Sequence, residues 1–232
     1  MKRKISIILL LFTLITQNVQ ASIIDSLIYV FSAKPAFEET QTASRIYDDT
    51  QNHWCNYSAE RLYNEGIFKG IQIGDKSYFM PDVYITRGEF LLYLNTLLQK
   101  DTSSSVTLPF ADASSIPVWQ LPTVSAMYKA GIIHGNTEKQ KLYFNHDEKI
   151  SRLDCAIILN NMLNIKNNDS KADFYDSYLI PKYAVGAVKN VTDYGLMNGF
   201  EDQSFRPYIK ITRGMLAEIL CNVKDYIESK SK

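Results

Sequence analysis

Three arginines of this 232-residue chain recur in equivalent surroundings, and arginine is the side chain best suited to bind a carboxylate. Arg87, Arg152 and Arg213 each follow directly after an Ile-Thr or Ile-Ser pair. We expect the Thr or Ser to cap a helix, which places each arginine at the first helical position. A cation there opposes the helix dipole, so stability alone explains the placement poorly. Because a guanidinium can donate two parallel hydrogen bonds and a helix start offers further N–H groups, the pattern predicts a carboxylate pocket at each arginine.

A structural role for the same arginines remains open. Each one can instead bridge to an aspartate near the start of a repeat and lock that repeat; the aspartates are Asp49, Asp112 and Asp176. Capping by itself explains the residues that precede the arginines, which are Thr86, Ser151 and Thr212. It also explains Glu89 and Asp154, since each stands three residues after its cap and completes a capping box.

The arginines belong to an internal repeat of about 60 residues. Gly66, Gly131 and Gly195 are 65 and 64 residues apart, and a second glycine follows four residues after each. An aromatic residue stands 12 residues before the first glycine of every copy: Trp54, Trp119 and Tyr183. Such self-similarity indicates a repeat protein, in which one unit cannot bury its apolar face and neighbouring units bury it together.

Each copy has the pattern of two helices joined by a loop. Apolar residues at helical spacing predict both helices, and the first glycine, which can take positive φ, should end the first one. We therefore predict an all-α fold of three helix-loop-helix repeats packed around a pseudo-threefold axis. Repeat 1 is assigned to residues 45–105, repeat 2 to 106–170 and repeat 3 to 171–232.

Four further residues are candidates for contact with a ligand. Trp54 and Trp119 can stack on the apolar face of a sugar ring, although a place in the core is the favoured interpretation of both. Gly70 and Gly199 serve mainly to permit backbone conformations that other residues disfavour, and they also allow a loop to approach a ligand closely.

The first 21 residues have the pattern of a secretory signal peptide, with three basic residues, a short apolar run and small residues before the expected cleavage site. An uncleaved membrane anchor is the alternative. Residues 22–44 are predicted to be a linker. Without the signal the chain has 22 basic and 25 acidic residues, which does not suggest a nucleic-acid partner. The predicted location is outside the cell, with no membrane span after cleavage; the resemblance given below narrows this to the cell wall or cell surface.

The sequence does not indicate catalytic or metal chemistry. Three cysteines in a secreted chain are no disulfide framework, and apolar neighbours predict that Cys55, Cys155 and Cys221 are free and buried. The histidines lack metal-ligand spacing, and no nucleophile–base arrangement or carboxylate pair stands out. We therefore expect no enzyme, no metal and no cofactor.

The order of motifs resembles the S-layer homology domain. Repeat 1 is the closest match, with His53-Trp54, Gly66-Ile67, Phe79-Met80-Pro81-Asp82 and Ile85-Thr86-Arg87-Gly88-Glu89-Phe90. The resemblance extends from Ile46 to about Ile227, in three copies in register.

This resemblance implies helical modules that usually come in threes and hold proteins non-covalently to the bacterial envelope. It further implies binding of a secondary cell-wall polysaccharide, through a pyruvylated sugar, in grooves between neighbouring repeats. In the family the arginine of a Thr-Arg-Ala-Glu motif meets the carboxylate, a role that falls here on Arg87, Arg152 and Arg213. An envelope protein is a second candidate partner.

Departures from the family pattern leave an alternative function open. In repeat 2, residues 136–141 replace a short Gly-rich loop and His146 replaces a proline. In repeat 3, Tyr183 replaces the tryptophan and Met215 replaces the capping acid. The alternative is an envelope structural or protein-interaction module that keeps the fold and has lost sugar binding.

Overall fold

The computed structural model describes residues 46–103, 106–164 and 173–230. The predicted signal peptide and the predicted linker lie outside these ranges. The described helices and strands are, in chain order, α2 (Asn56–Asn64), β1 (Ile71–Ile73), β2 (Lys76–Tyr78), α3 (Arg87–Leu98), α4 (Leu121–Lys129), β3 (Asn136–Glu138), β4 (Lys141–Tyr143), α5 (Arg152–Leu163), α6 (Val185–Asp193) and α7 (Arg213–Lys230). Three short 3-10 helices accompany them, at Ala113–Ser115, Ser177–Leu179 and Lys182–Ala184. The predicted all-α class is confirmed.

The first helices of the three repeats, α2, α4 and α6, end at the predicted glycines. Gly66, Gly131 and Gly195 have φ angles of 70°, 68° and 68°, a conformation that glycine adopts at little cost. Each of these helices buries apolar residues on one face: Ala59, Leu62, Val124, Met127, Ala187 and Val188.

The second helices, α3, α5 and α7, begin at the three arginines, as predicted. Thr86 and Ser151 form complete capping boxes with Glu89 and Asp154. In α7 the cap is one-sided, because the Thr212 hydroxyl accepts from the Met215 N–H at 3.3 Å but a methionine side chain cannot return a bond.

In repeats 1 and 2 the loop between the two helices contains a hairpin that the sequence analysis did not predict. Strand β1 pairs antiparallel with β2, and β3 pairs with β4. An aspartate from the start of each repeat fastens the end of the loop: the Asp49 carboxylate accepts from the N–H groups of Phe79 and Met80 at 2.8 and 2.7 Å. Asp112 and Asp176 make the same pair of bonds in repeats 2 and 3. These charge-assisted bonds hold the positive φ of the residue after each Phe, which is 60° at Met80.

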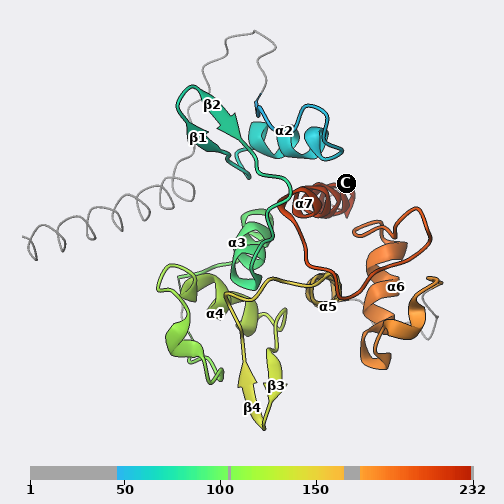
Figure 1. Cartoon of the computed structure of the whole chain (residues 1–232). Coiled ribbons are helices and arrows are strands. Elements are labelled where there is room, and N and C mark those ends of the chain that lie inside the picture. The colour runs from blue at the N-terminus through green and yellow to red at the C-terminus, as the bar shows by residue number, and fades with distance from the viewer. Residues whose placement is uncertain (1–45, 104–105, 165–172, 231–232) are drawn as a thin grey trace, which may run out of the picture. The chain divides into compact units, whose positions relative to one another are not determined.

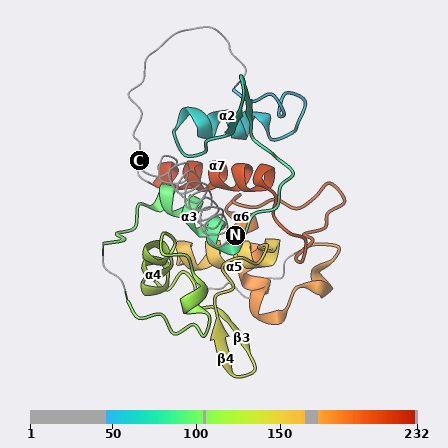
Figure 2. The same cartoon turned by 60° about the vertical axis from the view of Figure 1, so that its left-hand side comes forward.

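The helices pack mainly between repeats. Helix α3 contacts α4 of the next repeat, α5 contacts α6, and α7 contacts α2. The last helix therefore lies against the first one, which both cartoon views show (Figures 1 and 2). The contacts form a closed cycle, so the apolar face of every repeat is covered by a neighbour.

Three backbone hydrogen bonds at the starts of the second helices confirm the pseudo-threefold arrangement. The Ile85 N–H donates to the Ile211 carbonyl at 3.1 Å, the Ile150 N–H to the Ile85 carbonyl at 3.1 Å, and the Ile211 N–H to the Ile150 carbonyl at 2.9 Å. The three bonds close a ring, and all three isoleucines are buried.

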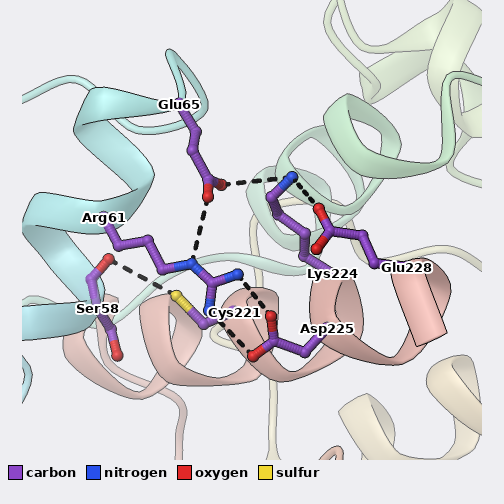
Figure 3. A network of polar contacts seen from close by, with 7 residues as sticks. All are labelled: Ser58, Arg61, Glu65, Cys221, Lys224, Asp225 and Glu228. Carbon is purple, nitrogen blue, oxygen red and sulfur yellow. Dashed lines mark hydrogen bonds and ion pairs between the residues drawn. The ribbon is translucent and has the colours of Figure 1, made fainter.

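The joint between α2 and α7 carries a polar network at the surface (Figure 3). Arg61 donates two hydrogen bonds to the Asp225 carboxylate, at 3.0 and 2.5 Å, and a third to Glu65 at 3.2 Å. Lys224 lies 3.8 Å from Glu65 and 2.7 Å from Glu228. The Arg61 bonds lower the pKa of Asp225 below its ordinary value. The network joins the first repeat to the last.

The three cysteines are free and buried, as predicted. Within the described ranges, none of the helices has both the length and the apolar character that a membrane crossing requires.

Candidate ligand-binding grooves between repeats

The N–H groups at the start of each second helix are already bonded to a neighbouring repeat. In α3 the Arg87 N–H donates to the Glu148 carbonyl and the Gly88 N–H to the His146 carbonyl, both at 2.8 Å. The first two N–H groups of α5 and α7 bind the equivalent carbonyls, which belong to Ile209, Pro207, Val83 and Pro81. The expectation that these helix starts offer free N–H groups to an anion is therefore wrong.

Each arginine side chain reaches from its own repeat into the next one. Arg152 donates from Nε to the Phe205 carbonyl at 2.8 Å and from Nη2 to the Asn198 carbonyl at 2.6 Å. Its guanidinium carbon lies 4.8 Å from the ring centroids of both Phe200 and Phe205. These rings and carbonyls hold the guanidinium in one orientation at the joint of repeats 2 and 3.

The alternative in which the arginines bridge to Asp49, Asp112 and Asp176 is not observed in the described residues. Those carboxylates accept from backbone N–H groups of their own loops. Arg213, like Arg152, instead donates to a loop carbonyl, with Nε 2.7 Å from the Phe79 oxygen. The arginines do lock the structure, but they do so between repeats: Arg152 and Arg213 bind loop carbonyls, and Arg87 pairs with Asp154.

A groove of about 620 Å³ is lined by residues of all three repeats. Repeat 2 contributes Arg152, repeat 1 contributes Trp54, and repeat 3 contributes the loop after α6 and one face of α7. Among the residues of repeat 3 that line the groove are Gly199, Met215, Glu218 and Ile219. We call this site the repeat 3 groove. It brings together three of the seven predicted ligand-binding residues, Trp54, Arg152 and Gly199.

The preference for placing the two tryptophans in the core was wrong. Trp54 is 58% exposed and Trp119 is 41% exposed. Next to Trp54, it is Cys55 that is buried. Trp119 is not among the lining residues of either groove described here.

The two predicted loop glycines are required by packing inside their own repeats. A Cβ atom on Gly199 would lie 2.6 Å from a ring carbon of Phe174, and a Cβ on Gly70 would lie 2.7 Å from the Tyr78 carbonyl oxygen. Gly199 also lines the repeat 3 groove, whereas Gly70 lines neither groove described here. The close approach that these glycines permit is to aromatic residues and backbone of the protein itself.

A second groove, of about 540 Å³, is the pseudo-equivalent site around α5, and we call it the repeat 2 groove. It is lined by Arg87 of repeat 1, Asp154 and the loop after α4 of repeat 2, and Tyr183 of repeat 3. Nη1 of Arg87 lies 3.6 Å from Oδ1 of Asp154. Arg87 is 7% exposed, and its buried Nε has no hydrogen-bond partner among the described residues. Burial lowers the pKa of this guanidinium, and the nearby Asp154 opposes that effect.

The third arginine is covered by aromatic side chains. The Arg213 guanidinium carbon lies 4.7 Å from the ring centroid of Phe68. Phe68 and Tyr93 are stacked, with centroids 4.1 Å apart and ring planes 11° apart. Nη1 of Arg213 also donates to the Tyr93 hydroxyl at 3.4 Å. The Nε and Nη1 donors of Arg213 and the face of its guanidinium group therefore all contact other residues of the protein.

Sequence reasoning missed a contact among a cysteine, a histidine and an aspartate. Nδ1 of His53 lies 3.1 Å from Sγ of Cys55, and its Nε2 lies 3.4 Å from Oδ1 of Asp82. The short His-x-Cys spacing was a signal, but nothing local placed Asp82 beside it. Cys55 is 1% exposed, and burial raises the pKa of its thiol to about 11. The thiol is therefore protonated near neutral pH and poorly suited to act as a nucleophile.

Cyclic packing of three helix-loop-helix repeats, with an arginine at every joint, defines a helical repeat module with grooves between its repeats. The family model for the S-layer homology domain matches residues 46–91, 109–154 and 173–214, which together make up more than half of the chain. The chain belongs to the S-layer homology domain family, and the three matched segments confirm three tandem copies.

Several curated proteins contain a similar segment. The chain is 27% identical over 196 residues to an amylopullulanase of Thermoanaerobacterium thermosulfurigenes, covering 82% of this chain and 10% of that protein. It is 26% identical over 206 residues to an endoglucanase of Bacillus sp. (strain KSM-635), covering 86% and 21%. It is 25% identical over 181 residues to S-layer protein sap of Bacillus anthracis, covering 77% and 21%. The chain thus spans only about a fifth or less of these relatives. Family and relatives together support a location at the cell surface and a role in attachment there.

Proposed function

We propose that this chain is a non-catalytic wall-binding module that attaches non-covalently to an anionic secondary cell-wall polysaccharide, through a sugar that carries a pyruvate ketal. The observation that carries the proposal is the convergence of Arg152, Trp54 and Gly199, from three different repeats, on one groove. A ligand in that groove contacts every repeat at once.

The chemistry of the repeat 3 groove suits such a sugar. Arg152 supplies a permanent cation that two carbonyl bonds hold in place. Trp54 supplies an exposed aromatic ring, which suits the apolar face of a pyranose. Met215 and Ile219 supply apolar walls against which a ketal methyl group can pack. A carboxylate next to a methyl group on a rigid ring matches this mixture of charge and apolar surface.

The relatives favour attachment over a shared reaction. Proteins named amylopullulanase, endoglucanase and S-layer protein contain a segment similar to this chain, and the segment is 10–21% of each. A part shared among proteins with such different names is better explained by a common place of attachment than by a common substrate.

The repeat 2 groove supports a second candidate function, an envelope structural or protein-interaction module without sugar binding. There the Arg87 guanidinium is paired with Asp154 at 3.6 Å, which offsets the charge that an anionic sugar would require. If the repeat 3 groove behaved in the same way, the fold would remain and the ligand would be lost.

Co-sedimentation with purified sacculi of the producing bacterium tests the proposal. The protein should pellet with native sacculi, and it should stay in solution with sacculi stripped of their secondary polysaccharide. Native sacculi whose carboxylates have been converted to neutral amides provide the charge control, and they should bind at least tenfold less protein. Failure to pellet with native sacculi would contradict the proposal and favour the interaction module.

A further inference from the structure

The loop after α6 contains the single Asn-Gly pair of the sequence, Asn198-Gly199. Asparagine followed by glycine is the pair most prone to spontaneous deamidation, because a residue without Cβ lets the following main-chain nitrogen reach the side-chain amide. Repeats 1 and 2 have Lys69 and His134 before the equivalent glycines, and neither residue can react in this way. Among the three equivalent loops, the reactive pair is therefore confined to repeat 3.

Deamidation at this pair needs only water and a base such as hydroxide. The base takes the proton of the Gly199 nitrogen, which then forms a bond to Cγ of Asn198. The bond from Cγ to Nδ2 breaks, and the departing group takes a proton back and leaves as ammonia. Water opens the resulting succinimide ring at one of its two C–N bonds. One opening gives aspartate, and the other gives isoaspartate, in which the main chain continues through the former side chain.

The two reacting groups are accessible and uncommitted in the folded chain. Asn198 and Gly199 are both exposed. Among the described residues, neither the side-chain amide of Asn198 nor the N–H of Gly199 makes a hydrogen bond. The next N–H, of Phe200, is held by the Ser204 carbonyl at 2.8 Å. No hydrogen bond within the described ranges has to break before the two groups can react.

Arg152 acts on the peptide group that must lose the proton. Its Nη2 donates to the Asn198 carbonyl at 2.6 Å, and this carbonyl belongs to the same amide as the Gly199 N–H. When that amide loses its proton, negative charge moves onto the carbonyl oxygen, where a hydrogen bond from a cation becomes stronger. A donor that is already aimed at developing charge lowers the barrier of a reaction. The hydrogen bond should therefore speed the formation of the succinimide.

The groove as a whole does not supply this effect. Three acidic residues line it beside the arginine: Glu201, Asp202 and Glu218. Their charges oppose a further negative charge, and Asp202 is paired with Arg206 at 2.9 Å. The argument therefore depends on the single bond from Arg152 to the Asn198 carbonyl and not on the net charge of the groove.

We propose that Asn198 is a site of spontaneous deamidation in the folded chain and that Arg152 promotes the reaction. This inference goes beyond the proposed function and does not depend on what the groove binds. Both products add a negative charge to the groove. In isoaspartate the former main-chain carbonyl becomes the free carboxylate, so the oxygen that now accepts from Arg152 carries the new charge. Arg152 should favour this product, because it pairs with a carboxylate more strongly than with a neutral carbonyl.

The first test is incubation of the purified protein at mildly alkaline pH, once folded and once unfolded in guanidinium chloride, followed by peptide mass mapping. We expect Asn198 to be converted at least as fast in the folded chain as in the unfolded one. The folded chain should also give the larger share of isoaspartate, which a methyltransferase specific for that residue labels. Slower conversion in the folded chain would overturn the inference.

His134→Asn is the matched control, because it creates an Asn-Gly pair at the equivalent place of repeat 2. Arg87, the arginine of that joint, makes no hydrogen bond to the His134 carbonyl among the described residues. In the folded variant the new asparagine should be converted about tenfold more slowly than Asn198, and in the unfolded variant the two rates should agree within about twofold. Equal folded rates at the two pairs would contradict the role of the arginine.

Arg152→Gln tests the arginine directly, because glutamine keeps a hydrogen-bond donor and removes the charge. In the folded variant, conversion of Asn198 should be at least about threefold slower than in the wild type, and in the unfolded variant it should be unchanged. Urea unfolding of the variant establishes that it is folded under the conditions of the incubation. An unchanged or higher rate at Asn198 in the folded variant would overturn the inference.

Discussion

The repeat 3 groove and the repeat 2 groove use the same architecture but treat their arginine differently. Each receives an arginine from the preceding repeat, a loop from its own repeat and an aromatic residue from the following one. Arg152 is satisfied by two loop carbonyls and two aromatic rings. Arg87 meets one ring, at 5.6 Å, and one carboxylate, and keeps a buried Nε without a partner.

This difference shows that a repeated scaffold does not by itself specify a repeated site. The arginine is retained in every copy because it joins neighbouring repeats, which is a structural task. Whether it can also bind an anion depends on a few facing residues that vary from copy to copy. A buried cation that lacks full hydrogen bonding is costly, so the joint at Arg87 should also be the weaker one.

The largest effect on stability is expected from replacing the arginines with methionine. Arg152→Met removes two donors and leaves the carbonyls of Phe205 and Asn198 without their partner, which should cost about 3 kcal/mol. Arg87→Met removes a donor that is already unsatisfied and should cost less than about 1 kcal/mol. Urea unfolding of the two variants beside the wild type measures both values. Equal losses would contradict the contrast between the two grooves.

The next largest effect concerns the packing between the first turn of α3 and the N-cap residue of α4. A Cβ atom on Gly88 would overlap the Gln120 side chain, whose buried Oε1 has no partner among the described residues. Gly88→Ala should therefore cost about 1–2 kcal/mol, and adding Gln120→Ala should recover most of it.

Gly214→Ala is the matched control for this packing. At Gly214 the nearest atom to an added Cβ is Sγ of Cys55 at 3.2 Å, a tight contact but not an overlap. It should therefore cost less than Gly88→Ala. The double-mutant cycle consists of the wild type, Gly88→Ala, Gln120→Ala and the double variant, and thermal unfolding measures all four beside Gly214→Ala. Strict additivity of the two single effects would show that positions 88 and 120 are not coupled.

Much of the fold could be predicted from local signals in the sequence. The glycines that end the first helices, the caps at Thr86 and Ser151 and the buried cysteines depend on residues close in the chain, and all were confirmed. The cyclic order followed from the argument that one repeat cannot bury its own face. The hairpins were not predicted because each strand has only three residues. Strand β1 does alternate, as Ile71-Gln72-Ile73, but its side chains are all exposed and the strand buries no apolar face.

The site was harder to predict because it is made between repeats. The sequence shows that Arg152, Trp54 and Gly199 recur, but it does not show that residues about 100 and 50 positions apart from different copies meet in one groove. The exposure of Trp54 also depends on how α7 packs against α2, which no local pattern encodes. The partners of the arginines were missed for the same reason, since backbone carbonyls carry no signature in the sequence.

The smallest expected effect distinguishes the third joint, between α2 and α7, from both grooves. At this joint Arg61 pairs with Asp225 at the surface. Because the Asp225 side chain is 56% exposed, Asp225→Asn should cost about 1 kcal/mol or less. Arg61 lowers the pKa of Asp225, so the stabilisation is present above the pKa of an unfolded aspartate, about 4, and is lost as the pH falls through the lower folded value. Urea unfolding at pH 7 should show the difference between Asp225→Asn and the wild type, and 1 M salt or a pH near 2 should remove most of it, because salt screens exposed pairs. Asp193→Asn, which loses only a within-helix contact to Lys189, is the surface control. A loss at Asp225 that persisted unchanged in salt and acid would mean that this joint depends on packing, as the grooves do, and not on charge.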